Sequence, residues 1–287
     1  VVLMLQDTTE LDFNGQSIDG LGPLSYEAQR GLYVHPTYAV STDREPLGVL
    51  DAWMWAREPK DADGQHPGIK ESMRWVEGYE RVAELAGELP DTRLVYVADR
   101  ESDMIELMAR ADDLETPADW LLRSPHDRAL PGGQTLWQTV TSGDELGGIC
   151  FTLPSRQGQK ARQVRQRIWA RVVERPHGKP QAIRATGVVA KEIDPPAGSP
   201  PVEWRLLTNR TAETLAEVAE RIDWYRARWE IESLFHILKN GCRIESLQLG
   251  TIDGLQRAIA LYLIVSWRIA MLGCVENHRE LITAEAK

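Results

Sequence analysis

The sequence predicts an α/β fold in which helices flank a mixed β-sheet and a β-rich insertion interrupts the chain. Short apolar runs that end in an acid, at residues 1–7 and 94–99, indicate two buried strands. Longer segments with apolar residues at helical spacing alternate with such runs. Residues 124–203 are instead punctuated by Gly and Pro and show period-2 alternation, which predicts the insertion.

The first part of the chain predicts five strands and two helices. Two β-like runs separated by Thr-Asp-Arg-Glu predict a hairpin, and an amphipathic segment that stops before Pro90 predicts a helix. In order, the expected elements are strands Val1–Asp7, Leu32–Ser41 and Pro46–Ala56, helix Ile69–Leu89, strand Leu94–Ala98, helix Ser102–Ala111 with Ser102 as its cap, and strand Trp120–Arg123.

The last part of the chain returns from the insertion to a short strand and two helical segments. These are strand Trp204–Thr208, a long amphipathic helix within Thr211–Lys239 and a more apolar helix within Asp253–Val275. This order of elements is that of an RNase H-like fold. We therefore expect a catalytic core in two parts, residues 1–123 and 204–287, separated by the insertion 124–203, which lies between the fifth strand and the late helix that carries Glu232.

Composition favours a globular protein that acts in the cytoplasm. The first residues lack the basic and apolar regions of a secretory signal, and the three cysteines are scattered without metal-ligand or disulfide spacing. Ala258–Val275 is the most apolar segment, but Ser266 and Arg268 interrupt it, so a buried helix is expected rather than a membrane span. The absence of an initiator Met, together with a strand-like first segment, predicts that the chain is a fragment of something longer.

The charge distribution is uneven. The chain has a formal net charge of -10, which argues against general non-specific binding to nucleic acid. Residues 155–191 nevertheless contain ten Lys or Arg and a single acid, Glu174. Such a stripe could neutralise several DNA phosphates, and the alternative is an ordinary solvated hairpin.

Three acids are the candidate metal ligands and catalytic residues. Asp7 closes the first strand and Asp99 the fourth, so both carboxylates are expected at the same edge of the sheet. Hard cations such as Mg²⁺ prefer carboxylate oxygens, and two ions about 3.5–4 Å apart can activate the attacking oxygen and stabilise the leaving one in phosphoryl displacement. Glu232 is the candidate third ligand. Each acid alone also has a structural interpretation: a turn at Asp7, a helix cap at Asp99 and a solvated helix face at Glu232.

The surroundings of Glu232 carry the most specific motif. Tyr225, Arg228, Glu232 and Lys239 fall at spacings of one helical stripe, which is polar where a core stripe would be apolar. Tyr-x2-Arg-x3-Glu-x6-Lys resembles the signature of bacterial insertion-sequence transposases of the IS-four and Tn-five type, which belong to the DDE superfamily. The plain alternative is a charged solvent face.

Other strings resemble the same family over most of the chain. Gln6-Asp7-Thr8-Thr9 and Asp99-Arg100-Glu101 match the motifs of the first and second aspartates, and Arg30-Gly31 with Val34-His35 matches a short block between them. The resemblance implies DNA contacts for the following residues: Tyr225, Arg228, Lys239, Trp204, Arg123, Arg100, His236 and Arg30. His236 stands where relatives often have a second Lys, and Trp204 stands where the family keeps a Trp that stacks on a flipped base; a core aromatic is the alternative for Trp204.

The resemblance implies a cut-and-paste DNA transposase core. Its expected cofactor is Mg²⁺, two ions per site, with Mn²⁺ as a substitute; its expected partners are the transposon ends, target DNA and a second copy in the full-length synaptic complex. The expected location is the bacterial cytoplasm, at the nucleoid. The family's N-terminal end-recognition domain and C-terminal dimerisation region are not recognised in this sequence. Two alternatives remain: a truncated or domesticated core that binds DNA without cleaving it, and a general RNase H-like nuclease or resolvase.

Overall fold

The computed structural model of the chain describes residues 1–61, 64, 70–153, 161–175 and 182–285. Two compact units emerge from the contacts within the chain. Unit 1 comprises Val1–Val82, Asp91–Leu94 and Ala227–Lys287, and unit 2 comprises Ala83–Pro90 and Val95–Arg226. The elements are those of the predicted RNase H-like α/β class, with parallel and antiparallel strand pairs and flanking helices.

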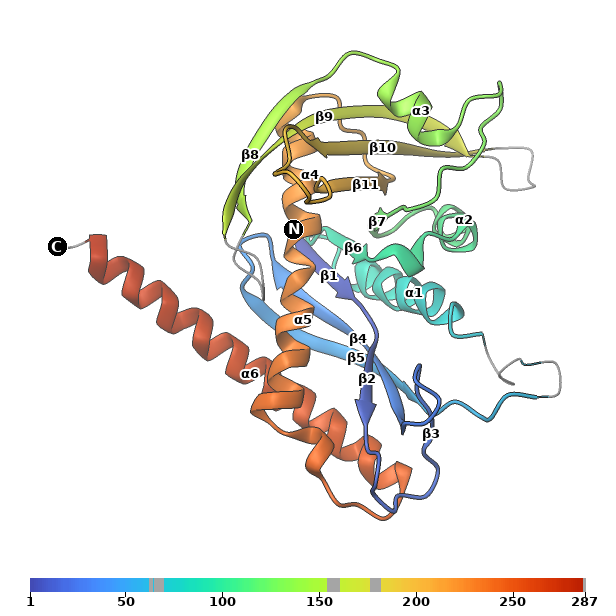
Figure 1. Cartoon of the computed structure of the whole chain (residues 1–287), viewed down its shortest axis with the longest axis vertical. Helices are drawn as coiled ribbons and strands as arrows, with labels where there is room; N and C mark the ends of the chain where they lie inside the picture. Colours follow the sequence, from blue (N-terminus) through green and yellow to red (C-terminus); the bar gives the residue numbers. More distant parts are fainter. Residues whose placement is uncertain (62–63, 65–69, 154–160, 176–181, 286–287) are drawn as a thin grey trace. The chain divides into compact units, whose positions relative to one another are not determined.

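The strands of unit 1 are organised around one long strand, β4 (Figure 1). All four partners of β4 run antiparallel to it. The hairpin predicted from the sequence is confirmed as β4 and β5. The bounds are β1 (Val2–Gln6), β2 (Thr9–Asp12), β3 (Gly22–Pro23), β4 (Arg30–Ser41) and β5 (Pro46–Trp55). Burial of all residues from Gly31 to Val40 makes β4 the centre of this core.

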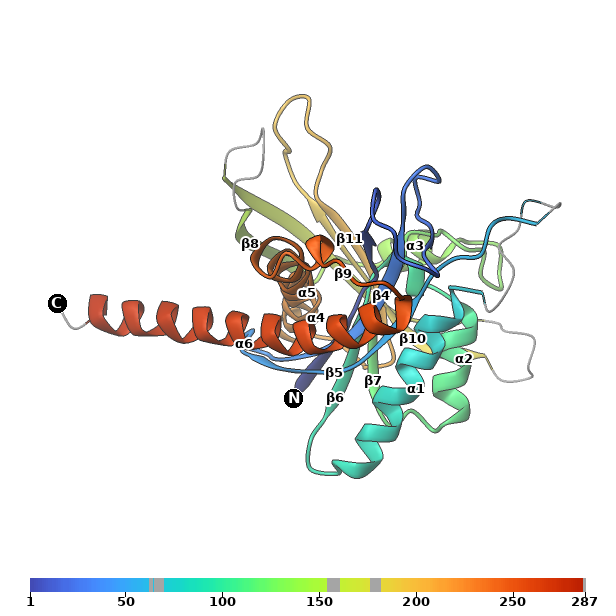
Figure 2. The same ribbon diagram turned by 90° about the horizontal axis from the view of Figure 1, so that it is seen from below.

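The helices of unit 1 come from both ends of the chain. They are the first part of α1 (Met73–Glu88), α5 (Trp229–His236), a π-helical turn η2 (Ile237–Gly241), a short 3-10 turn η3 (Ile244–Ser246) and α6 (Ile252–Glu285). α6 lies along β5, where Gln256 Nε2 donates to the Met54 carbonyl at 3.2 Å and Trp267 Nε1 donates to the Pro46 carbonyl at 3.1 Å (Figure 2).

The prediction that Ala258–Val275 forms a buried helix is wrong about burial. In helix α6 the exposed fractions of Leu261, Ile264 and Leu272 are 65%, 51% and 58%. These residues are exposed because only one side of the helix packs on β5. By length and composition alone, Ile252–Cys274 could cross a membrane, and 17% of its apolar window is buried. A single helix of this kind is weak evidence for a membrane protein, since helices of soluble proteins pass the same test.

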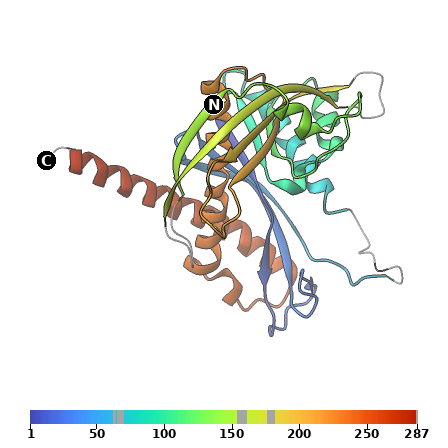
Figure 3. The ribbon, with the colours of Figure 1, turned by 45° about the horizontal axis from the view of Figure 1, so that its top comes forward.

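Unit 2 combines one parallel strand pair with an antiparallel series. β6 (Leu94–Ala98) pairs parallel with β7 (Asp119–Arg123), which places the ends of both strands at one edge. β7 is followed in space by β11 (Glu203–Thr208), β10 (Ile183–Glu192), β9 (Arg162–Arg175) and β8 (Gly147–Leu153), each antiparallel to its neighbour (Figure 3). The predicted β-rich character of residues 124–203 is therefore confirmed for the described part of that segment.

A short helix inside this β-rich segment was missed in the sequence. α3 (Leu136–Thr141) begins with a capping box formed by Thr135 and Gln138 and lies on β9 and β10. Gly187 makes the close approach possible, because a Cβ atom there would lie 2.6 Å from Val140 Cγ2. Six residues are too few for a helical period to stand out from the surrounding alternation.

One helix prediction needs correction. Ser102 does not cap a continuous helix: Arg100–Ser102 form a separate 3-10 turn, η1, whose cap is Asp99, and α2 (Ile105–Asp113) begins after Met104 without a side-chain cap. The long helical segment predicted within Thr211–Lys239 is present and begins at Leu215. It comprises α4 (Leu215–Ala227), α5 and the turn η2, and Arg228, between α4 and α5, keeps right-handed helical backbone angles (φ -53°, ψ -28°).

Candidate active site

Asp7 lies where the first strand of unit 1 ends. The residues before it form the buried strand β1, so the chain delivers Asp7 to the end of a rigid element. Its Oδ1 accepts a hydrogen bond from the Thr8 backbone N–H at 2.8 Å, which orients the carboxylate. The side chain keeps 24% exposure, so a ligand can reach it.

Arg228 joins Asp7 to Glu232. Its Nη1 donates to Asp7 Oδ2 at 2.5 Å and its Nη2 donates to Glu232 Oε1 at 2.8 Å. Arg228 is 5% exposed, whereas Glu232 on α5 is 54% exposed. Two of the three predicted acids, more than 220 positions apart in sequence, therefore converge on one guanidinium group.

The convergence of Asp7 and Glu232 fits a cation-binding role. Carboxylate oxygens are the ligands that hard divalent cations prefer, and here two of them lie at one point, with their charge balanced by Arg228. Among the residues that the structure describes, no group of three or more His, Cys, Asp or Glu side chains is close enough to hold a metal ion. The donor types suit Mg²⁺, and Arg228 is the cationic group that holds them in the described arrangement.

Asp99 belongs to unit 2, where it directly follows β6. Its side chain accepts from the Arg100 backbone N–H, so it caps η1, and the Arg100 guanidinium lies 3.9 Å from its carboxylate. Asp99 keeps 22% exposure. The structural interpretation of Asp99 as a cap is thus correct, and its meeting with the other two acids stays a prediction.

The predicted DNA-contacting residues of unit 1 differ in exposure. His236, the last residue of α5, and Arg30, the first residue of β4, are exposed. Arg30 also donates to the Leu21 carbonyl. Lys239 is half-buried in the π-helical turn η2, and such turns are frequent at functional sites. These three cations remain predicted phosphate contacts.

Of the predicted contacts in unit 2, Arg100 is exposed and the other three are less accessible. Tyr225 is buried in α4, and Arg123 is half-buried at the end of β7. Trp204 on β11 is 6% exposed and stacks on Phe151 of β8, with ring centroids 5.2 Å apart and an interplanar angle of 22°. The Arg226 guanidinium covers the same Phe151 ring at 4.7 Å. This packing favours the core-aromatic interpretation of Trp204.

Replacing Trp204 by Ala is expected to destabilise the protein. Loss of a buried Trp leaves a cavity and typically costs about 3–5 kcal/mol, whereas Trp204→Phe keeps a ring against Phe151 and should cost much less. Urea unfolding of the two variants measures the difference. An unchanged stability in Trp204→Ala, accompanied by lost DNA binding, would contradict this expectation and restore the base-stacking role.

In the part of the chain that the structure describes, five of the ten cations of the basic stripe predicted at residues 155–191 form ion pairs with acids outside the stripe. Two of its exposed β9 arginines face acids from outside the stripe: Arg165 lies 3.4 Å from Asp194, and Arg167 lies 3.4 Å from Glu145. The exposed Arg171 instead donates to the Thr139 carbonyl at 3.2 Å and to Ser142 Oγ at 3.0 Å. The other described ion pairs of the stripe are Arg162–Glu192, Arg175–Asp103 and Lys191–Glu203. Arg156, Lys160 and Lys179 lie outside the described residues. In the described part of the stripe, the cations therefore do not form a continuous unpaired track for DNA.

Asp103 is a buried charged residue that sequence reasoning missed. Its Oδ2 accepts from Ser124 Oγ and from Arg128 Nη1, both at 2.6 Å, and Arg175 Nη1 lies 3.6 Å from its Oδ1. Ser102 Oγ donates to the Asp99 carbonyl at 2.5 Å, so the turn that carries Asp99 is anchored next to this network. No local pattern marks Asp103, because its partners lie 21 to 72 positions away in sequence.

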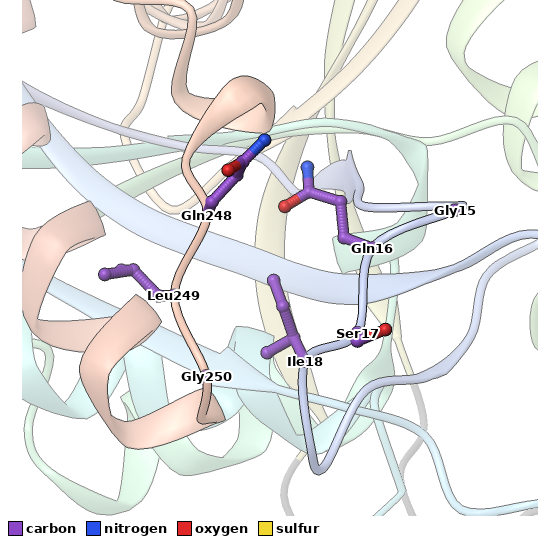
Figure 4. A pocket seen from close by; sticks show the side chains of 7 residues that line it. All are labelled: Gly15, Gln16, Ser17, Ile18, Gln248, Leu249 and Gly250. Atoms are coloured by element: carbon purple, nitrogen blue, oxygen red, sulfur yellow. The ribbon is translucent and has the colours of Figure 1, made fainter.

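A cavity of unit 1 lies apart from the acids just described. It has a volume of about 400 Å³ and lies between two loops, Gly15–Ile18 and Gln248–Gly250 (Figure 4). Gln16 and Gln248 are its polar side chains with amide groups, and Gln16 Nε2 donates to the Glu245 carbonyl at 2.6 Å. None of the residues that line it is an acid or a base, so it offers no group for proton transfer.

A comparison with protein families identifies one family. Residues 77–268, more than half of the chain, match the family described as transposase DDE domain. Among solved structures, the chain is similar to the piggyBac transposase in its synaptic complex with hairpin DNA, with 10% sequence identity and a TM-score of 0.45. That similarity covers 100% of this chain and 48% of the other, so the chain spans about half the length of that protein.

Proposed function

The chain belongs to the transposase DDE domain family, and we propose that it is a catalytic core that cleaves and joins DNA strands at the ends of a transposable element. The observation that carries the proposal is the convergence of Asp7 and Glu232 on Arg228, at 2.5 and 2.8 Å. One carboxylate follows a strand and the other lies on a helix, and both side chains remain partly exposed to solvent. The reaction is hydrolysis of a phosphodiester, followed by attack of the freed 3′-hydroxyl on a second strand.

The proposed cofactor is Mg²⁺, two ions per site, with Mn²⁺ as a substitute. Asp7 and Glu232 would hold it, and Asp99 is the proposed third ligand. When bound, such an ion polarises a phosphate oxygen and makes the attacking oxygen easier to deprotonate. In the protein alone, Arg228 directs both carboxylates at one point, because its guanidinium donates a hydrogen bond to each of them.

DNA is proposed to approach the exposed side of α5. Glu232 and His236 are both exposed there, and Lys239 follows in η2. Lys is suited to phosphate contacts as a point charge, and such contacts position a duplex without reading its sequence. The proposed partners are therefore the DNA of the element's ends and of the target, bound by a homodimer of the full-length protein.

Removing the Lys239 charge should weaken DNA binding uniformly across sequences. The Lys239→Ala variant is expected to lower the slope of log K against log salt by about one, because one fewer counterion is released. Fluorescence anisotropy of labelled duplexes over a salt series measures the slope. Lys60→Ala is the control. Lys60 is an exposed lysine that lies far from α5 in sequence and pairs with Glu27 at 2.5 Å. An equal slope in both variants contradicts the assignment of Lys239.

A strand-cleavage assay tests the proposed function. Purified protein is incubated with a duplex that carries the cognate end, in Mg²⁺, in Mn²⁺ and in EDTA. We expect nicking that depends on either metal and disappears in Glu232→Ala. Metal-independent DNA binding without any cleavage would instead support a binding core that lacks activity. Cleavage of duplexes regardless of the end sequence would support a general RNase H-like nuclease.

A further inference from the structure

A cluster of buried polar side chains lies behind Asp7 in unit 1. Gln6 and His35 are 0% exposed and Thr37 is 1% exposed, although they come from the strands β1 and β4 of an apolar core. Buried polar groups are costly unless they are hydrogen-bonded. The arrangement of these bonds therefore indicates what the cluster does.

The cluster forms a chain of hydrogen bonds centred on His35. Gln6 Nε2 donates to Thr37 Oγ1 at 2.6 Å, which leaves Gln6 Oε1 directed at His35 Nε2, 3.1 Å away. Because that oxygen can only accept, the Nε2 of His35 carries the proton. The other ring nitrogen, Nδ1, then accepts from Thr8 Oγ1 at 2.8 Å.

The imidazole of His35 is held rigidly and without charge. The Trp75 ring meets it edge-on, with centroids 4.6 Å apart and an interplanar angle of 87°, and Trp53 lies at 6.1 Å. Burial, together with the nearby positive charge of Arg74, lowers the pKa of His35 to about 3. The ring is therefore neutral at the pH of a cell, as the two hydrogen bonds require.

Helix α1 is shaped to accommodate the cluster. A Cβ atom at Gly78 would lie 2.0 Å from Gln6 Oε1 and 2.3 Å from Gln6 Nε2. Gly is less favourable than Ala within a helix, so its presence at the point where α1 passes the Gln6 amide is explained by the space that the amide occupies. The backbone of α1 thus closes the cluster from one side.

The chain of bonds reaches Asp7 from both sides. Gln6 and Thr8 are the two neighbours of Asp7, and the side chains of both are tied to the same imidazole. The Thr8 N–H in turn donates to Asp7 Oδ1, while Oδ2 of Asp7 faces Arg228. We infer that His35 is a positioning residue, which fixes the direction of the Asp7 carboxylate for cation binding through Gln6 and Thr8. This inference rests on the proposed metal-dependent function.

The test compares two variants of the bond chain with two matched controls. His35→Ala removes the imidazole, and Val40→Ala removes core volume from the same strand without touching the cluster. Thr8→Val removes one hydroxyl, and Thr9→Val makes the same change one residue further along, where the side chain is also mostly buried. Thr8→Val keeps the side-chain shape and leaves the ring in place, so it tests the inference even if His35→Ala fails to fold.

The primary readout is direct Mn²⁺ binding, measured by electron paramagnetic resonance of the free ion. Loss of a group that orients a metal ligand typically costs about 10–100-fold in metal affinity. We expect the dissociation constant to rise at least about 10-fold in His35→Ala and Thr8→Val, and to stay near wild type in both controls. The cleavage rate at saturating Mn²⁺ should fall much less than the rate at low Mn²⁺.

Nuclear magnetic resonance of ¹⁵N-labelled histidine provides an independent readout. We expect the His35 signals of a neutral ring protonated at Nε2, unchanged between about pH 5 and pH 8. A ring protonated at Nδ1, or a charged ring in that range, overturns the hydrogen-bond chain as described.

An Asp7→Asn variant separates failure of this inference from failure of the proposed function. If Asp7→Asn loses Mn²⁺ affinity while His35→Ala and Thr8→Val match their controls, the positioning role is overturned and the metal site stands. If Asp7→Asn binds Mn²⁺ as tightly as wild type, the proposed metal site fails and the inference falls with it.

Discussion

Glu232→Gln is expected to abolish metal-dependent strand cleavage while the protein stays folded. The amide keeps the size of the side chain but removes the negative charge that a hard cation requires. We expect the rate to fall by about 1000-fold or more, equivalent to about 4 kcal/mol of transition-state stabilisation. Stability should change little, because the Glu232 side chain is 54% exposed and exposed ion pairs contribute little.

The matched control for this variant is Glu230→Gln, the same change two residues earlier on α5. Burial raises the pKa of Glu230. The described ion pairs of Arg228 are with Asp7 and Glu232, not with Glu230. Cleavage of a labelled duplex in Mn²⁺ should therefore persist in Glu230→Gln. Equal losses in the two variants, or full activity in Glu232→Gln, would remove Glu232 from the catalytic site.

Asp103→Ala is expected to produce a large loss of stability. The Asp103 side chain is 0% exposed, and the Arg175 guanidinium next to it is 4% exposed. Burial lowers the pKa of Arg175, while the Asp103 carboxylate acts in the opposite direction. Removing one partner of a buried ion pair leaves the other charge uncompensated, which costs about 3–5 kcal/mol. Ser124 also loses its hydrogen-bond acceptor.

A double variant distinguishes the ion pair from simple packing. In Asp103→Leu combined with Arg175→Met, neither charge remains buried. The thioether introduced by the second substitution would be able to pack beside Met108, whose sulfur now accepts from Arg175 Nη1 at 2.8 Å. We expect urea unfolding to show much of the lost stability restored in the double variant. Losses that simply add across the two positions would argue that the pair is not coupled.

Several elements were predictable because their signals are local. Strands β1 and β6 are short apolar runs that end before an acid, and β4 and β5 are two such runs joined by a polar turn. The stripe that contains Arg228 and Glu232 was also recognisable, because helical spacing is a property of neighbouring residues. These signals placed Asp7 directly after a strand and Glu232 on a helix, as the structure has them.

The failures share a cause as well. Whether an apolar helix is buried depends on what packs against it, and α6 meets β5 on one side only. Whether an arginine is available to DNA depends on acids that lie far away in sequence, as Glu145 does for Arg167. Hydrophobic period and charge count contain no information on either question.

The amino-acid order by itself determined the secondary structure around the candidate site and the identity of its acids, since backbone propensity, periodicity and motif spacing act over a few residues. Only the tertiary structure decided that Arg228 lies between Asp7 and Glu232, that His35 stands behind Asp7, and that Asp103 is buried with two arginines. Such contacts join residues tens to hundreds of positions apart, and their energy depends on burial, which exists only once the chain has folded.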